Sequence, residues 1–248
     1  MDALHVATLN IRNLADRWDE RLPLLLADMA ALQPDLLGLQ EVVYPLQQDR
    51  LLGAAGEDRY EAVRAWAGRP EYGNSLLVRA PLEATGPERL DLGATRSALR
   101  IRVALPGGAR VVFAVSHLHH IPADEEIRSA QVEALLSWLD ASPEHDALVV
   151  AGDFNASPHE PAYARMRDAG FTSAYAQAHG DEPAVTWPSG LVAPGMDTDG
   201  DPGCLDYVWV RGRVRVTEAR LCFDRPAVGD PTLYPSDHVG VAARLVIG

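Results

Sequence analysis

The chain has 248 residues, 47% of them apolar, and its 22 basic and 35 acidic side chains give a net charge of −13. All of the basic residues are arginines, which excludes a lysine Schiff base and a phosphate-binding loop built on lysine. The acidic balance argues against a duplex-DNA binder with a basic face. Without a linker or low-complexity tract, one domain over residues 1–248 is expected.

The amino terminus, MDALHVATLN, has no basic segment before an apolar stretch and so lacks the pattern of a secretory signal. No apolar run approaches the roughly 18 residues of a membrane helix. We therefore expect a soluble, cytoplasmic protein without stable membrane insertion. Cys204 and Cys222 form no Cys-x-x-Cys pair, so we expect two buried thiols, with a disulfide as the alternative.

The first half of the chain is rich in strand patterns. Strands are expected where apolar residues alternate or cluster between turn signals, over residues 4–10, 35–41, 75–78, 97–105 and 110–117. Residues 19–32 carry apolar side chains at helical spacing, and Pro34 closes that helix.

The second half adds an amphipathic helix over residues 123–139, with its apolar side through Ile127, Ala130, Ala134, Leu135 and Trp138. Further strands are expected over residues 146–155, 205–210, 213–223 and 236–247. Strands outnumber helices, and several follow one another directly. An α+β layered sandwich therefore fits better than a doubly wound parallel sheet.

Polar side chains recur at the ends of these predicted strands, where a buried charge is costly unless it has a purpose. They lie at the carboxyl end of a strand or near the start of one: Asn10, Glu41, His117, Asp153, Asn155, Asp206, Asp237 and His238. Strands of alternating direction bring such ends to one edge, so the pattern predicts a single site.

The residue types of this set suit phosphate chemistry. Its carboxylates and amides are the oxygen ligands that Mg²⁺ prefers. His117 and His238 are able to contact or protonate a phosphate oxygen, and Asp206 is placed to hold the second ring nitrogen of His238. Such a set favours hydrolysis of a phosphate ester.

Seven stretches in order carry a family resemblance: TLNIRN, LLGLQEV, YGNSLLVRAPL, VSHLHH followed by RSAQ, VVAGDFNASP, LDYVWV and SDHVGV. Together they resemble the motifs of the endonuclease/exonuclease/phosphatase superfamily of DNase I-like phosphoesterases, from residue 4 to about residue 245. The resemblance implies a four-layer α/β/β/α sandwich of two mainly antiparallel sheets flanked by helices. It also implies a site that depends on Mg²⁺ or Mn²⁺ at one end of the sheets.

By this resemblance, Asn10, Glu41 and Asp237 hold the metal. Many members of the superfamily carry a further acidic residue shortly after the first of these positions, whereas this chain has Arg12. Any secondary metal contact at that position is therefore in question.

The resemblance also implies the catalytic roles. Asp153, assisted by Asn155, orients and deprotonates the attacking water. His238, paired with Asp206, holds the scissile phosphate. His117 lies on the far side, where it stabilises the transition state or assists the leaving group.

Plainer interpretations stand beside these roles. Asp153 and Asn155 are also suited to cap a helix, and His117 to a place in the core. His119 and His120 next to it invite a zinc interpretation. Several other polar residues either brace the site or make ordinary turns and ion pairs: Asn74, Arg96, Arg128 and Gln131.

The acidic stretch MDTDGDPG places Asp197, Asp199 and Asp201 at alternate positions, as calcium loops do. Pro202 and Val208 stand where an EF-hand needs Gly and Glu, so that match fails. A structural Ca²⁺ site is the alternative to a solvated acidic loop.

The sequence thus predicts a metal-dependent hydrolase of a phosphodiester, or of a phosphomonoester. The substrate is either a small or lipid-like diester or a nucleic acid, and the net charge tilts the choice away from a duplex. Trp187 and Tyr207 suit either stacking on a base or the core. The alternatives are an endonuclease or exonuclease on DNA or RNA, and a non-catalytic binding module on the same fold.

Overall fold

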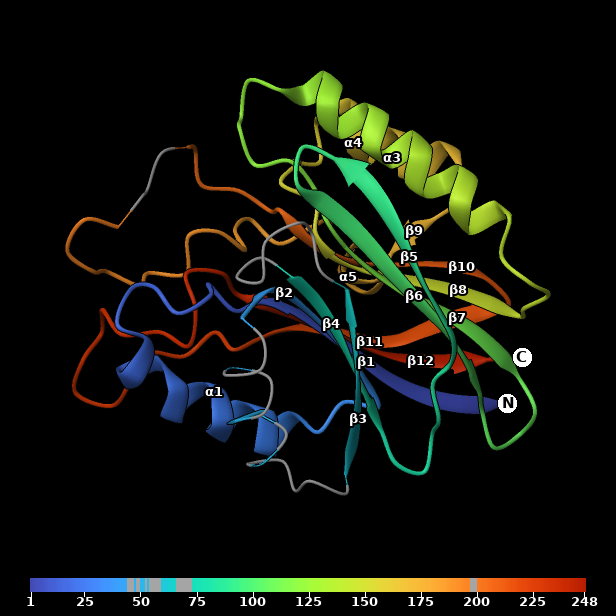
Figure 1. Ribbon diagram of the computed structural model, residues 1–248, viewed down its shortest axis with the longest axis horizontal. Coiled ribbons are helices and arrows are strands. Elements are labelled where there is room, and N and C mark those ends of the chain that lie inside the picture. The colour runs from blue at the N-terminus through green and yellow to red at the C-terminus, as the bar shows by residue number, and fades with distance from the viewer. Residues whose placement is uncertain (44–46, 48–49, 52, 54–58, 66–72, 197–199) are drawn as a thin grey trace.

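The computed structural model describes residues 1–43, 47, 50–51, 53, 59–65, 73–196 and 200–248 (Figure 1). Its strands and helices follow in the order β1 (Asp2–Asn10), α1 (Trp18–Leu32), β2 (Leu36–Val42), β3 (Tyr60–Ala65), β4 (Gly73–Arg79), β5 (Thr85–Gly93), β6 (Arg96–Ala104), β7 (Arg110–His117), α3 (Glu125–Asp140), β8 (Ala147–Asp153), α4 (Pro161–Asp168), β9 (Thr172–Ser173), α5 (Ala174–His179), β10 (Asp206–Gly212), β11 (Val214–Cys222) and β12 (Gly240–Ile247). Among these described helices, none is long and apolar enough to cross a membrane.

The described strands form two six-stranded sheets, in the orders β11-β12-β1-β2-β4-β3 and β5-β6-β7-β8-β10-β9. In each sheet one pair is parallel, β1 with β2 and β7 with β8, and the other pairs are antiparallel. Parallel neighbours need a long crossover, which α1 supplies in the first sheet and α3 in the second.

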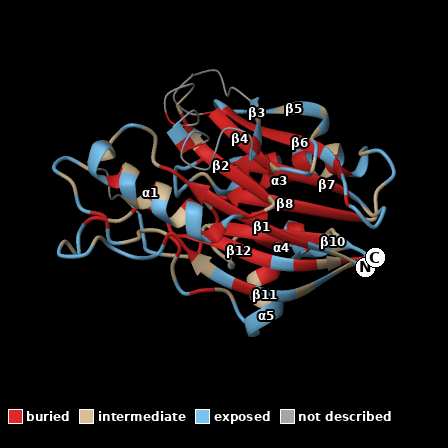
Figure 2. Cartoon of the chain, turned by 90° about the horizontal axis from the view of Figure 1, so that it is seen from below, coloured by how far each residue is buried: buried red, intermediate tan, exposed pale blue. Residues whose placement is uncertain are grey.

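The sheets pack face to face, and their inner side chains form a core that includes Val6, Val115, Val149 and Leu245. Strand β8 is buried along its whole length, because its other face lies under α3 and α4 (Figure 2). A strand covered on both sides has no polar face, which explains why β8 reads as a continuous apolar run.

Helices cover the two outer faces (Figure 1). Leu25, Met29 and Leu32 of α1 pack on the first sheet, while Leu135 and Leu139 of α3 pack on the second. The resulting four layers confirm the predicted α+β sandwich of two mainly antiparallel sheets flanked by helices. The two chain ends lie together, since Asp2 pairs with Ile247.

Two predicted elements need correction. The last strand begins at Gly240 rather than at residue 236, because the backbone before Gly240 bonds to the loop before β10 and not to β1: the Val239 N–H donates to the Thr186 carbonyl, and the Asp237 carbonyl accepts the Ser189 N–H. The predicted apolar side of α3 was wrong at Ile127, Ala130 and Ala134, which are exposed; of the five predicted residues, Leu135 is buried and Trp138 is half-buried. The buried side of α3 holds Arg128, which bonds backbone carbonyls.

Gly152 allows the close approach of β7 and β8. It lies opposite Ser116 with φ at 146°, and a Cβ there would lie 1.9 Å from the Ser116 carbonyl oxygen. We expect Gly152→Ala to lower the free energy of unfolding by about 3 kcal/mol, from strain and clash together, and Tm by roughly 6–12 °C. Thermal unfolding measures this.

Gly108→Ala is the matched control, because Gly108 also has a positive φ, 93°, but open space where a Cβ would be. It carries the backbone strain without the clash. Equal effects of the two substitutions would contradict the assigned role of the β7–β8 contact.

Candidate active site

The strand registers bring the polar strand ends to one edge of the sandwich. Asp153 lies opposite His117 across the parallel β7–β8 pair and opposite Asp206 across the antiparallel β8–β10 pair. In the other sheet, Asn10 ends β1 and Glu41 lies near the end of β2, at the edge where the loop before β12 brings in Asp237 and His238.

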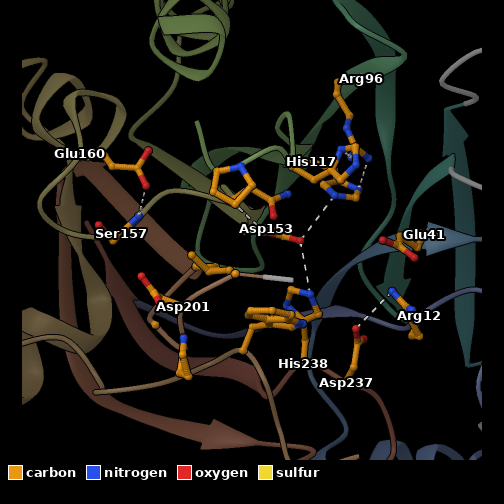
Figure 3. Close-up of a pocket in the computed structure, with 18 of the residues that line it drawn as sticks. Arg12, Glu41, Arg96, His117, Asp153, Ser157, Glu160, Asp201, Asp237 and His238 are labelled. Carbon is orange, nitrogen blue, oxygen red and sulfur yellow. Dashed lines mark hydrogen bonds and ion pairs between the residues drawn. The ribbon is translucent and has the colours of Figure 1, made fainter. Parts of the chain in front are cut away.

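A pocket of about 750 Å³ opens at this edge (Figure 3). Six of the predicted site residues line it: Glu41, His117, Asp153, Asn155, Asp237 and His238. The other two, Asn10 and Asp206, are each 1% exposed and contact the lining residues from behind.

Asp153 lies at the centre of these contacts. Its Oδ1 accepts the backbone N–H of Asn155 at 2.9 Å, and its Oδ2 accepts the Asn10 amide at 3.0 Å. The Nε2 atoms of His117 and His238 lie 3.5 and 3.7 Å from Oδ2. Burial raises the pKa of Asp153, although the cationic His238 opposes this shift.

His238 and Asp206 form a buried ion pair. Nδ1 of His238 lies 2.9 Å from Oδ2 of Asp206, and that oxygen also accepts the Thr186 hydroxyl at 2.7 Å. Burial alone would lower the pKa of His238, but Asp206, Asp153 and Asp237 outweigh it and hold the pKa well above its usual range. The surrounding carboxylates therefore favour the imidazolium form of His238.

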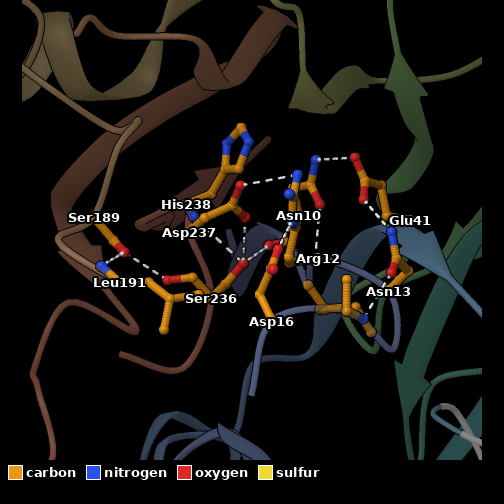
Figure 4. A network of polar contacts seen from close by, with 12 residues as sticks. Asn10, Arg12, Asn13, Asp16, Glu41, Ser189, Leu191, Ser236, Asp237 and His238 are labelled. Atoms are coloured by element: carbon orange, nitrogen blue, oxygen red, sulfur yellow. Dashed lines mark hydrogen bonds and ion pairs between the residues drawn. The ribbon is translucent and has the colours of Figure 1, made fainter. Parts of the chain in front are cut away.

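Glu41 and Asp237 face the pocket from the first sheet (Figures 3 and 4). Glu41 accepts hydrogen bonds from the amides of Asn10 (3.3 Å) and Asn13 (3.0 Å), and Arg12 lies 3.4 Å from Asp237. Burial, and next the repulsion of Asp237, raise the pKa of Glu41.

A half-buried and a buried carboxylate that repel each other, Glu41 and Asp237, fit a divalent cation, whose charge would relieve that repulsion. The Asn10 amide nitrogen faces Glu41 and Asp153, while its carbonyl oxygen accepts the Arg12 N–H. Direct ligation by Asn10 therefore requires its amide to turn over. Asp153, Asp206 and His238 also offer ligand atoms within 4.8 Å of one another, but the Asp206–His238 bond already occupies part of that group.

Arg21 is a part of the site that the sequence analysis missed. Its side chain is fully buried and donates to six backbone carbonyls, those of Ile11, Arg12, Asn13, Ala15, Asp16 and Pro235. It thereby ties the loop after β1 to the loop that carries Asp237. Its signal is its place at helical spacing before Leu25 and Met29, on the buried side of α1.

The other candidate residues brace the edge. Arg128 pairs with Glu160 at 2.7 Å, and Asn74 donates to the Ser97 carbonyl at 2.7 Å. His119 pairs with Asp124 at 2.8 Å. Within the described part of the chain, no group of three metal-ligating side chains includes His119 or His120, so nothing supports zinc there.

The structure also places the predicted cysteines, the two aromatic residues and part of the suggested Ca²⁺ site. Both cysteines are free and buried. Tyr207 belongs to the core and donates to backbone carbonyls, whereas Trp187 lines the pocket. Of the suggested Ca²⁺ ligands, Asp197 and Asp199 lie outside the described residues, and Asp201 lies on the rim of the pocket.

Comparison with known proteins gives relatives of two kinds. Nocturnin of Xenopus laevis is 26% identical over an alignment of 253 positions, and the alignment covers 91% of this chain and 64% of the relative. The uncharacterized protein YbhP of Escherichia coli is 28% identical over 202 residues, 74% of this chain and 78% of the relative. The chain spans 57 to 64% of the length of the curated nocturnins it matches.

Solved structures share the fold. The human nocturnin catalytic domain with bound sulfate aligns with a TM-score of 0.80 at 24% identity, covering 100% of this chain and 97% of that one. TDP2 of D. rerio, complexed with a single-strand DNA product, aligns with a TM-score of 0.81 at 19% identity, covering 98% and 99%.

The family model described as "Endonuclease/Exonuclease/phosphatase family" matches residues 7–238. This match confirms the family predicted from the sequence motifs. The chain belongs to the endonuclease/exonuclease/phosphatase family.

Proposed function

We propose that this protein hydrolyses a phosphodiester by attack of a water molecule that Asp153 activates. The observation that carries the proposal is the position of Asp153 between a neutral and a cationic imidazole, His117 and His238, on the wall of one pocket. Both imidazole nitrogens lie farther from Asp153 than a hydrogen bond allows. Each is therefore available to donate to a phosphate oxygen.

Three side chains have separate roles in this reaction. Asn155 fixes one oxygen of Asp153, so that the other faces the water and takes its proton. The imidazolium of His238, held by Asp206, binds a phosphate oxygen and offsets its developing charge. His117 donates to the phosphate from the other side.

Glu41 and Asp237 are the residues we assign to a Mg²⁺ or Mn²⁺ ion, with Asn10 as a third ligand once its amide turns over. When bound, such an ion neutralises charge on the phosphate and leaving oxygens. Arg12 contacts Asp237 and contributes one further positive charge on this side.

A small or lipid-like diester fits the pocket better than a duplex. The exposed carboxylates of Glu125 and Asp201 are among its lining residues, and no arginine occurs between Asp168 and Val210. An acidic rim repels a polyanionic backbone. The second candidate is a single-stranded nucleic acid, which the product named for D. rerio TDP2 and the place of Trp187 in the pocket favour.

The test is hydrolysis of bis-p-nitrophenyl phosphate, of the matching monoester and of single-stranded and plasmid DNA, with EDTA, Mg²⁺, Mn²⁺ or Ca²⁺. We expect diester turnover with Mg²⁺ or Mn²⁺ that EDTA abolishes, and no plasmid cleavage even at low salt. DNA cleavage that falls steeply as salt rises would replace the small-diester proposal by the nuclease. Binding without turnover of any substrate would favour the binding module.

A further inference from the structure

Arg96 contacts two histidines at the wall of the pocket (Figure 3). It begins β6 and is 8% exposed. Its Nη1 lies 3.1 Å from Nδ1 of His117, and its Nη2 lies 3.0 Å from Nδ1 of His120. One guanidinium thus reaches the same ring atom of both imidazoles.

The chemistry of these contacts decides where the histidine protons are. A guanidinium is always charged and only donates hydrogen bonds, so the two Nδ1 atoms must accept and carry no proton. A neutral imidazole then carries its proton on Nε2. In His117 that nitrogen is the one facing Asp153, at 3.5 Å.

We propose that Arg96 is a positioning residue that holds His117 as a neutral imidazole with its proton on Nε2, aimed at the phosphate. The catalytic consequence rests on the proposed function. His117 then serves as a hydrogen-bond donor and not as the acid that protonates the leaving group, because loss of its Nε2 proton would leave an imidazolate beside Asp153. Of the two roles that the family resemblance implies for His117, this selects stabilisation of the transition state.

The surroundings agree with this state. The groups facing His117 are Arg96 of β6, Asp153 of β8, His120 of the following loop and His238. Burial lowers the pKa of His117 well below its usual range, and Arg96, His238 and His120 lower it further. His238 is the opposite case, since its Nδ1 faces the Asp206 carboxylate and donates.

Gln131 of α3 holds the two segments together. Its amide donates to the carbonyls of Leu92 and Gly93, at the turn that delivers Arg96, and its carbonyl oxygen accepts the His119 N–H. Hydrogen bonds of Gln131 to the backbone of both segments therefore fix the distance between Arg96 and the histidines, which does not depend on the flexible Arg96 side chain alone.

The test is ¹⁵N–¹H long-range NMR of the full chain labelled in histidine, at neutral pH with and without Mg²⁺, with His117→Gln used for assignment. We expect the wild-type His117 ring to show an unprotonated Nδ1 and a protonated Nε2. A protonated Nδ1 in the wild-type protein, whether as the neutral Nδ1–H tautomer or as the imidazolium, overturns the proposal. Because this readout needs no substrate, it stands even if the proposed reaction fails.

Arg96→Met and Arg96→Lys complete the test. In Arg96→Met we expect the His117 signature to change and kcat to fall roughly 10- to 100-fold, the range for removing a residue that orients a catalytic side chain. Arg96→Lys keeps a cationic donor, so it should restore part of the His117 signature and part of kcat. It also keeps the test decisive if the methionine variant does not fold.

Arg100→Met is the matched control. Arg100 is a buried arginine on the same side of β6, but it contacts Glu88 and Ser142 away from the pocket. The Arg100→Met substitution should lower Tm and leave the NMR signature of His117 unchanged. An unaltered His117 ring in Arg96→Met, or the same change in Arg100→Met, would reject the positioning role.

Discussion

Asp153→Asn is expected to lower kcat for a phosphodiester by about 10³-fold, within the range that a general base contributes. The amide keeps the volume of the carboxylate and still accepts the Asn155 N–H, but it cannot take a proton from water. Steady-state kinetics with bis-p-nitrophenyl phosphate and saturating Mg²⁺ measure the loss. KM should change far less, because His117 and His238 remain to hold the phosphate.

The stability of this variant separates chemistry from folding. Burial raises the pKa of Asp153, so its ionised form is unfavourable in the folded state at neutral pH. The neutral amide removes that cost, but its NH2 group faces the donating amide of Asn10 where Oδ2 accepted a hydrogen bond. The two effects oppose each other, so Tm is expected to change little. Activity lost together with Tm would show that Asp153 acts through the fold instead.

Glu182→Gln provides the matched control. Glu182 is another carboxylate whose pKa is raised by burial, but it accepts hydrogen bonds from Tyr163 and Ser173 and does not line the pocket. Its substitution should leave kcat unchanged. A comparable loss in this variant would mean that kcat responds to any buried carboxylate, and would contradict the role of Asp153.

The sequence was informative where a local pattern has one physical cause. A strand buried on both faces must be apolar throughout, so β8 and the polar residues at its end were visible together. In β5 the reverse holds: it lies at the edge of its sheet with mostly exposed side chains, and no apolar pattern marks it. Strands β3 and β9 and helix α5 were missed as well.

Buried polar residues were the second limit. Polarity alone places arginine and glutamine on the outside of a helix, but Arg21, Arg128 and Gln131 are buried because they satisfy backbone carbonyls of the segments packed against their helices. Such partners are fixed by the tertiary structure and cannot be read from spacing. The residues that carry the chemistry of the site were therefore easier to predict than the buried polar residues that hold them in place.

His238→Gln and Asp206→Asn form the second test of the site, as a double-mutant cycle. We expect His238→Gln to lower kcat by about 10³-fold and Asp206→Asn by about 10²-fold, because the first removes a charged donor to the phosphate and the second removes the carboxylate that keeps that donor charged. The double variant should be about as slow as His238→Gln alone.

The reason for this non-additivity is that the Asp206 side chain is hydrogen-bonded to the pocket wall through His238. Its charge also raises the pKa of Asp153, but by less than His238 lowers it. Asp206 is 1% exposed and lies behind the pocket wall, with His238 and Thr186 on the same carboxylate oxygen. Thr186→Val removes the other partner of that oxygen and leaves both members of the ion pair in place, so it should reduce kcat far less than Asp206→Asn. It should lower Tm, because the Thr186 hydroxyl also accepts the N–H groups of Leu205 and Asp206. Free-energy costs that add in the double variant would mean that the two residues act independently, and that the imidazolium is not what Asp206 contributes.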